Sequence, residues 1–349
     1  MLKAIDREGV ARAVINIYVG PAIGNVMQQH GLQGHKANAL LTHHVPRWRA
    51  GGLTAAIVQI SDWPTLSMVL SEITQSEGAL KLVSTRADYE SLGSAFGIGF
   101  SLEGYTTLAG DFDAICAMSE IGLTAFTFSH NIQNVLCTGA NERFGEGGFS
   151  HLGKATLELL STLPVMVDLV HTSRASFWDA MDLYSGEVFV SHSNSNAVCE
   201  HPRNLTDEQV RAVAERGGMI GLNSYRGYVA KDPYSATISD YLDHAMHYYD
   251  LVGPRHLGIG ADFWEGPMEM LESALTAVDP DGSHGVGGAA SQIYATGPVG
   301  LEDITHMSKV LVGLADRGLT PDEVELVARG NYLAMLERAR PSTIQGVSA

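Results

Sequence analysis

The sequence predicts a single (β/α)8 barrel, the TIM-barrel form of the α/β class. Short apolar, β-branched runs alternate with helical patterns along nearly the whole chain. The runs are apolar throughout, which is typical of parallel strands that are covered by helices. Eight such strand–helix units in a chain of 349 residues fit one barrel. Because no linker or change of composition divides the chain, we expect residues 1–349 to form one domain.

Eight runs are predicted as strands, and helical patterns lie between and after them. The strands cover 13–19, 53–61, 96–103, 123–130, 164–171, 188–192, 219–224 and 256–263. The helices cover 63–82, 111–121, 151–163, 173–184, 205–217, 238–253, 301–318 and 321–339. Both sets follow from the length of each apolar run and from the period of its hydrophobic residues.

Two segments carry additional local signals. Thr206 is followed three residues later by Gln209, the spacing of a capping box, and Gly217 follows the end of the same helix. The segment 279–300 is rich in glycine and irregular, and it follows the eighth strand. Because the loops after the strands surround the mouth of a barrel, we expect this segment to lie over the mouth like a lid.

The composition indicates a globular protein and excludes several classes of partner. Hydrophobic residues make up 45% of the chain, and 22 basic residues stand against 39 acidic ones, for a net charge of −17. A disordered chain would have fewer apolar and more charged residues. The negative charge disfavours nucleic acid, which is bound by basic surfaces, and it equally disfavours an anionic membrane surface.

Cysteine usage and hydropathy give an expected location. No apolar stretch approaches the roughly 18 to 20 residues that span a bilayer. Cys116, Cys137 and Cys199 are odd in number and have no CxxC spacing. We interpret them as reduced thiols and expect a cytoplasmic protein with neither a disulfide framework nor a zinc knuckle.

Residues that can bind a metal or move a proton follow five of the predicted strands. They are Glu103, His130, His171, His192 and Asp262. One histidine in such a place would most often be a packed residue of the barrel rim. Five together, all at the carboxyl ends of strands, predict a shared polar site, because these ends build the active site of a barrel.

The residue types at these strand ends indicate metal-assisted hydrolysis. Glu103, His171 and His192 form the carboxylate and imidazole set that holds a catalytic zinc and leaves one position open. Asp262 is expected to take and return a proton outside that set. Arg203, in the stretch HPRN after the His192 strand, is a candidate clamp for a substrate carboxylate, although a surface arginine at a helix start is the commoner case.

Several motifs together resemble the renal (membrane) dipeptidase family, peptidase family M19. The stretches that carry the resemblance are VMVDLVHTS (165–173), VFVSHSNS (188–195), HPRNLTDEQV (201–210), GGMIGLN (217–223) and LGIGADFWEG (257–266), with support from RWRAGGLTAA (47–56), SLEG (101–104), FSHNIQN (128–134) and GNYLAML (330–336). They occur in the family's order at compatible spacings and cover most of the chain from about residue 45 onward.

The resemblance implies a metallo-dependent hydrolase barrel with a two-zinc site that cleaves dipeptides. It implies that Glu103 bridges two metals and that His171 and His192 bind the second of them. It gives His130 a place on the substrate, where it would stabilise the oxyanion. Arg203 would hold the terminal carboxylate of the substrate and Asp262 would act as general acid and base. Since members of the family often form dimers, a homodimer is also implied.

The chain departs from the family pattern at its first strand. There the family has a His-x-Asp pair that binds the first metal, whereas this strand offers Asn16, Tyr18, Gly20 and Pro21. An alternative alignment to QGHKAN retains a histidine but places Ala37 at the Asp position. In neither alignment is the pair intact, so we expect one tightly bound zinc per chain. A second metal stays possible through substitutes drawn from His30, His35, His43 and His44.

Three functions are compatible with these observations. The first is a zinc-dependent hydrolase of the dipeptidase type, acting on a dipeptide or a small amide with a free carboxylate. The second keeps the barrel and one metal but acts on a small molecule that is not a dipeptide. The third is a non-catalytic descendant that binds a ligand. Retention of Asp262 beside two imidazoles favours an enzyme over the third.

Overall fold

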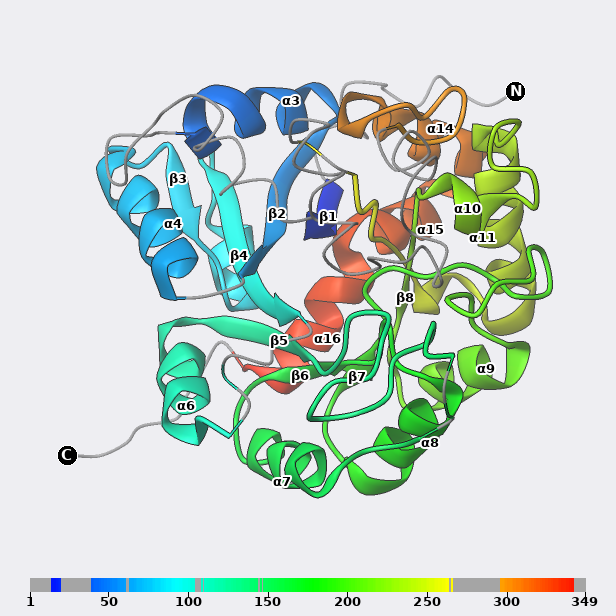
Figure 1. Cartoon of the computed structure of the whole chain (residues 1–349). Coiled ribbons are helices and arrows are strands. Elements are labelled where there is room, and N and C mark those ends of the chain that lie inside the picture. The colour runs from blue at the N-terminus through cyan, green and yellow to red at the C-terminus, as the bar shows by residue number, and fades with distance from the viewer. Residues whose placement is uncertain are drawn as a thin grey trace.

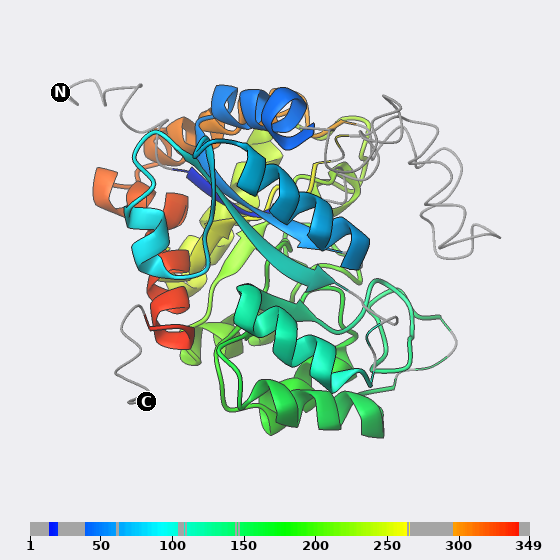
Figure 2. The same cartoon turned by 90° about the vertical axis from the view of Figure 1, so that its left-hand side faces the viewer.

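The computed structural model describes residues 14–19, 39–60, 63–103, 108, 110–143, 145, 147–263, 265 and 296–341, with residues 14–19 described by their backbone alone. Strands run through its centre and helices surround them (Figure 1). Seen from the side of helices α4 (Trp63–Gln75) and α6 (Phe112–Ile121), the helices lie on the outside of the strands (Figure 2). This arrangement confirms the predicted α/β barrel. The proposed lid over 279–300 lies, up to residue 295, outside the described residues.

Among the described residues, eight parallel strands follow one another around the barrel. They are β1 Val14–Val19, β2 Leu53–Ile60, β4 Phe96–Glu103, β5 Leu123–Thr127, β6 Met166–Asp168, β7 Val188–Phe189, β8 Ile220–Leu222 and β9 Leu257–Ile259. The first six pair in that order, and β8 pairs with β9. A parallel bridge between Val190 and Ile220 joins the two groups, and β9 contacts β1. The pattern of short parallel strands places all their carboxyl ends at one rim.

The predicted helix over 63–82 is wrong at its C-terminal part. Helix α4 covers Trp63–Gln75, and a short strand β3, Leu80–Leu82, follows it and pairs in parallel with residues 96–98 at the start of β4. Glu77 and Gly78 have φ angles of +52° and +89°. This left-handed turn ends the helix, since a right-handed helix cannot continue through it. Leu80, on β3, is buried in the core. The apolar residues of 63–82 therefore belong partly to a helix and partly to a strand.

The remaining helices follow the predicted positions, and most of them are shorter at their ends. Their bounds are α6 Phe112–Ile121, α7 His151–Leu160, α8 Arg174–Leu183, α9 Asp207–Glu215, α11 Ile238–Val252, α14 Ser308–Asp316, α15 Pro321–Glu325 and α16 Asn331–Ala339. The helix predicted over 321–339 has the predicted bounds but consists of α15, a π-helical segment Leu326–Gly330 and α16. Short helices α3 Val45–Ala50, α5 Arg86–Glu90 and α10 Arg226–Val229 were not predicted. The capping box of Thr206 and Gln209 is present at the start of α9, as the sequence predicted.

Aromatic and aliphatic side chains fill the space between strands and helices. Phe96, Phe100 and Phe126 are fully buried on β4 and β5, and Trp48 of α3 packs against Phe96 at a ring distance of 5.6 Å. No helix among the described residues is long and apolar enough to cross a membrane. The three cysteines are free thiols.

A buried carboxylate anchors the helical segment that precedes β2. Glu72 of α4 is 2% exposed, and its two oxygens accept the backbone N–H groups of Ala39 and Leu40 at 2.8 Å each. These N–H groups lie at the start of the helical turns at Leu40–His44, where no earlier carbonyl can accept them. Glu72 therefore replaces the missing partners of a helix N-terminus.

We expect Glu72→Ala to lower the free energy of unfolding by about 2–3 kcal/mol, because it leaves buried donors without acceptors. Glu72→Gln keeps one acceptor oxygen and should lose less. Urea unfolding of the purified variants measures both effects. Glu90→Ala is the control, since Glu90 is an exposed partner of Arg86 and its pair should contribute no more than about 0.5 kcal/mol. Equal losses for Glu72→Ala and Glu90→Ala would contradict the anchoring role.

Candidate functional site

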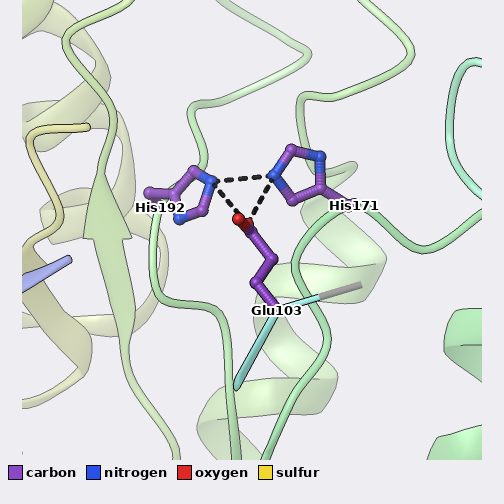
Figure 3. A group of neighbouring side chains, drawn as sticks. All are labelled: Glu103, His171 and His192. Carbon is purple, nitrogen blue, oxygen red and sulfur yellow. Dashed lines mark hydrogen bonds and ion pairs between the residues drawn. The ribbon is translucent and has the colours of Figure 1, made fainter. Parts of the chain in front are cut away.

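The carboxyl-end rim of the barrel gathers three side chains from separate strands. Glu103 is the last residue of β4, and His171 and His192 each lie three residues beyond β6 and β7. Glu103 Oε1 lies 3.0 Å from His171 Nε2 and 3.8 Å from His192 Nε2. The two Nε2 atoms are 3.0 Å apart. All three side chains point at one place (Figure 3), and their donor atoms lie within 4.8 Å of one another.

Both imidazoles are held in the neutral form. Burial lowers the pKa of His171 well below its ordinary value, and the charges of Arg203 and His130 lower it further. Burial and the neighbouring His171 lower the pKa of His192 in the same way, although Glu103 opposes the fall. Neutral imidazole is the form that binds a metal, because it keeps a lone pair on one ring nitrogen.

The hydrogen bond on the far side of His171 shows which nitrogen carries the proton. His171 Nδ1 lies 2.8 Å from Asn131 Oδ1, an amide oxygen that can only accept. The proton is therefore on Nδ1, and the lone pair of Nε2 faces the Glu103 carboxylate across 3.0 Å. Lone pairs opposed at that distance repel unless a cation lies between them. The donor set thus fits a divalent metal, and two imidazoles with a carboxylate are ligands that zinc takes at catalytic sites.

Strained backbone marks the same rim. Among the described residues, the non-glycine residues with positive φ are Glu77, Asn131, His171 and Asp262, and the last three have φ between +55° and +62°. Such conformations cost of order 1–3 kcal/mol each and persist where the surroundings hold them. Three of the four belong to the site or to its direct partners, so the fold keeps these side chains aimed at the rim.

Asp262 lies beside the group of three, three residues beyond β9. Its Oδ2 is 3.9 Å from His192 Nε2 and accepts a hydrogen bond of 3.2 Å from Asn223 Nδ2. Burial and the negative charge of Glu103 raise the pKa of Asp262 to about 7, against the opposing effects of Arg203 and of the Asn223 hydrogen bond. A carboxyl group with a pKa near neutrality can both accept and return a proton.

Arg203 brings a buried positive charge to the rim. It is 3% exposed, and its Nη2 lies 3.4 Å from His171 Nε2. The guanidinium carbon lies 5.3 Å from the centre of the Tyr228 ring, a cation–π contact. Among the described residues, no hydrogen-bond partner reaches the buried Arg203 Nε. A guanidinium held there with no carboxylate of the described part of the chain in ion-pair contact is arranged to receive an anion.

His130 lies at the open side of the rim. Its ring centre is 4.5 Å from that of His171, and the residue is exposed to solvent. The structure therefore brings all six predicted site residues to one end of the barrel. Glu103, His171 and His192 face one another directly, while His130, Arg203 and Asp262 surround them.

Of the four histidines considered as substitutes for the missing pair, two lie among the described residues and neither joins the group. His44 Nδ1 is 3.2 Å from Glu265 Oε2, and its ring packs on Trp48. His43 is exposed on the turn before it. His30 and His35 lie outside the described residues, as do Gly20, Pro21 and the side chains of Asn16 and Tyr18.

Sequence reasoning missed the residues that hold the site in place. Asn131, Asn223, Ser191 and Asp168 contact the site residues or their backbone. The predicted site consisted of imidazoles, carboxylates and one guanidinium, whereas these residues carry amides, a hydroxyl and a further carboxylate. A signal was present, because each of these polar residues ends or directly follows an apolar run and so has no reason to lie on the surface.

A family model described as membrane dipeptidase (peptidase family M19) matches residues 58–277. The chain belongs to this family. The match confirms the resemblance found in the sequence. It runs from the end of β2 to beyond β9 and therefore includes Glu103, His130, His171, His192, Arg203 and Asp262.

Individual relatives agree with this assignment. An uncharacterized dipeptidase of Schizosaccharomyces pombe is 29% identical over 234 residues, which are 66% of this chain and 50% of that protein. The chain spans about half the length of the curated relatives that it matches.

Solved structures share the fold of this M19 chain at low identity. A crystal structure of an amidohydrolase from Pseudomonas aeruginosa is 21% identical with a TM-score of 0.78, covering 97% of this chain and 99% of that one. A metallopeptidase from Rhodobacter sphaeroides, bound to a phosphinate mimic of the dipeptide L-Ala-D-Ala, is 20% identical with a TM-score of 0.75. The alignment covers 93% of this chain and 99% of the metallopeptidase chain.

Proposed function

We propose that this M19 chain is a metal-dependent hydrolase that cleaves the amide bond of a dipeptide or of another small amide with a free carboxylate. The observation that carries the proposal is the convergence of Glu103 Oε1, His171 Nε2 and His192 Nε2 beside a buried arginine with no anionic partner among the described residues. Zinc is the metal that best matches the donor set. We propose one zinc per chain, because the group of three is complete by itself.

A bound metal supplies Lewis acidity, which lowers the pKa of water and polarises the carbonyl of the substrate. Asp262 then accepts the proton of the attacking water at its carboxylate and passes it to the leaving nitrogen as the C–N bond breaks. His130, at the open side of the rim, is placed to donate a hydrogen bond to the oxyanion as the C–O bond forms.

Arg203 gives the site its preference for carboxylates. A guanidinium can donate two parallel hydrogen bonds to a carboxylate, and burial strengthens such a pair. The Tyr228 ring fixes the guanidinium from one side. A substrate bound by its carboxylate at Arg203 would place the neighbouring amide next to His171, because Nη2 is 3.4 Å from His171 Nε2.

Elemental analysis of the purified protein, combined with a panel of dipeptides, tests the proposal. Turnover of dipeptides by protein that carries metal supports it. Metal without dipeptide turnover would favour a hydrolase for a different small amide. Protein that binds no zinc from a metal-containing buffer would contradict the proposal and favour a ligand-binding descendant.

We expect Arg203→Ala to lower kcat/KM by about 100-fold for dipeptides with a free C-terminal carboxylate, since it leaves a buried anion without its partner. Dipeptides with an amidated C-terminus should lose no more than about threefold. Arg203→Lys should fall between the two, because lysine keeps the charge but not the two-pronged geometry. Steady-state kinetics on matched pairs of substrates measures the difference, and equal losses for both kinds of substrate would remove the clamp role.

We also propose that residues 1–349 act as a single catalytic domain in the cytoplasm. The described strands of the barrel extend from β1 at Val14–Val19 to β9 at Leu257–Ile259, and helices α14 to α16 follow them. The three free cysteines support a reducing compartment, where thiols stay unpaired.

A further inference from the structure

The Nδ1 atoms of His192 and His171, which point away from the metal site, have different hydrogen-bond partners. His192 is completely buried, and its Nδ1 lies 2.8 Å from the hydroxyl oxygen of Ser191. To offer a lone pair to a metal at Nε2, the ring must carry its proton on Nδ1, so Nδ1–H must donate to Ser191 Oγ. His171 instead donates to an amide oxygen, that of Asn131.

Ser191 is itself held by Asp168, a residue that is 3% exposed at the end of β6. The carboxyl group of Asp168 accepts the backbone N–H of Ser191, so the hydroxyl that faces His192 Nδ1 lies on a segment anchored by a buried carboxylate.

Asp168 also holds the backbone of the two segments that carry the histidines. Its Oδ1 accepts the N–H of Ser191 at 2.9 Å and the N–H of Val170 at 3.1 Å. Its Oδ2 accepts the hydroxyl of Thr127 at 3.2 Å. These donors come from the ends of β5, β6 and β7, and Val170 and Ser191 directly precede His171 and His192. Among the described residues, Asp168 forms no ion pair, so these hydrogen-bond donors are the groups that stabilise its carboxylate.

We propose that Ser191 and Asp168 are positioning residues that hold His192 with its Nε2 lone pair toward the metal site and thereby set the affinity of that site. The inference rests on the proposed metal site and deepens it. Asp168 immobilises both ligand segments through their backbone N–H groups, and the Ser191 hydroxyl accepts from the imidazole of His192. Partners of this kind behind ligating histidines typically change metal affinity by 10- to 100-fold when removed.

Titration of metal-free protein with Co²⁺, followed by its visible absorption, tests the proposal without reference to turnover. We expect Ser191→Ala to weaken Co²⁺ binding by about 10- to 100-fold. Ser191→Thr keeps the hydroxyl and should restore the affinity to within about threefold of the parent. Asp168→Asn keeps an acceptor for the backbone N–H groups but removes the charge, so it should also weaken binding.

Ser193→Ala is the matched control. Ser193 flanks His192 on the other side and is 1% exposed, but its hydroxyl donates to the carbonyl of Arg203 at 2.7 Å and does not touch the imidazole. Loss of this hydrogen bond perturbs the same buried loop, yet Co²⁺ affinity should change by no more than about threefold. Similar weakening in Ser191→Ala and Ser193→Ala would overturn the proposal and leave only a structural role.

A second measurement separates this inference from the proposed function. The ¹⁵N signals of the His192 ring in metal-free protein report which nitrogen carries the proton. We expect the proton on Nδ1 in the parent protein and a shift of this preference in Ser191→Ala. If the parent protein bound no Co²⁺, the proposed function would be wrong. The ring signals would still show whether Ser191 fixes the tautomer of His192. An unchanged tautomer in Ser191→Ala would overturn the inference even in protein that binds metal.

Discussion

Asp262→Asn is expected to lower kcat by about 10²- to 10⁴-fold, the contribution typical of a general acid or base. Asparagine keeps the size of the side chain and an oxygen for the Asn223 hydrogen bond, but it cannot take a proton. Metal content should stay at the parent level, because Asp262 lies outside the group formed by Glu103, His171 and His192. Kinetics and elemental analysis of the same preparation measure both properties.

The control for this variant is Asp243→Asn, the same substitution at an aspartate outside the site. Asp243 lies on α11, is exposed, and forms an ion pair with Arg317 at the surface. Asp243→Asn should leave kcat within about threefold, since an exposed pair contributes little. If Asp262→Asn retained activity within about tenfold of the parent, the assignment of proton transfer to Asp262 would be wrong.

The second large effect is expected at Glu103. Glu103→Gln keeps the shape of the side chain but removes the negative charge that balances a divalent ion between two neutral imidazoles. We expect metal content to fall to about a tenth of the parent level or less, and turnover to be lost with it, because two imidazoles alone hold zinc weakly. Elemental analysis after dialysis measures this directly.

Two comparisons make the Glu103 result specific. His130→Ala removes an imidazole from the open side of the same rim, and its metal content should equal that of the parent. Adding a chelator should lower the Tm of the parent, because a bound metal stabilises the folded state by mass action, and should leave the Tm of Glu103→Gln unchanged. A Glu103→Gln protein that kept its full metal content would contradict the assignment of this carboxylate as a ligand.

Much of the fold was predictable because its signals are local. Continuous apolar runs such as 96–103 predicted a strand with the bounds that β4 has, and Thr206 with Gln209 predicted the start of α9. The helix predicted over 63–82 was wrong beyond Gln75, because Glu77 and Gly78 turn the chain through left-handed conformations. The apolar residues on both sides of that turn serve two different elements, and periodicity alone does not separate them.

The sequence by itself determined the barrel, the family and the set of ionisable residues at the strand ends, because each of these depends on the order of residues along one segment. Only the tertiary structure decided which nitrogen of His171 faces Glu103, what lies behind His192, and why the carboxyl group of Asp262 titrates near neutrality. Asn131 and His171 are 40 residues apart, and Asp168 and Ser191 are 23 apart. Proton positions and pKa values follow from distances between such segments and from their burial, and those distances exist only once the barrel has closed.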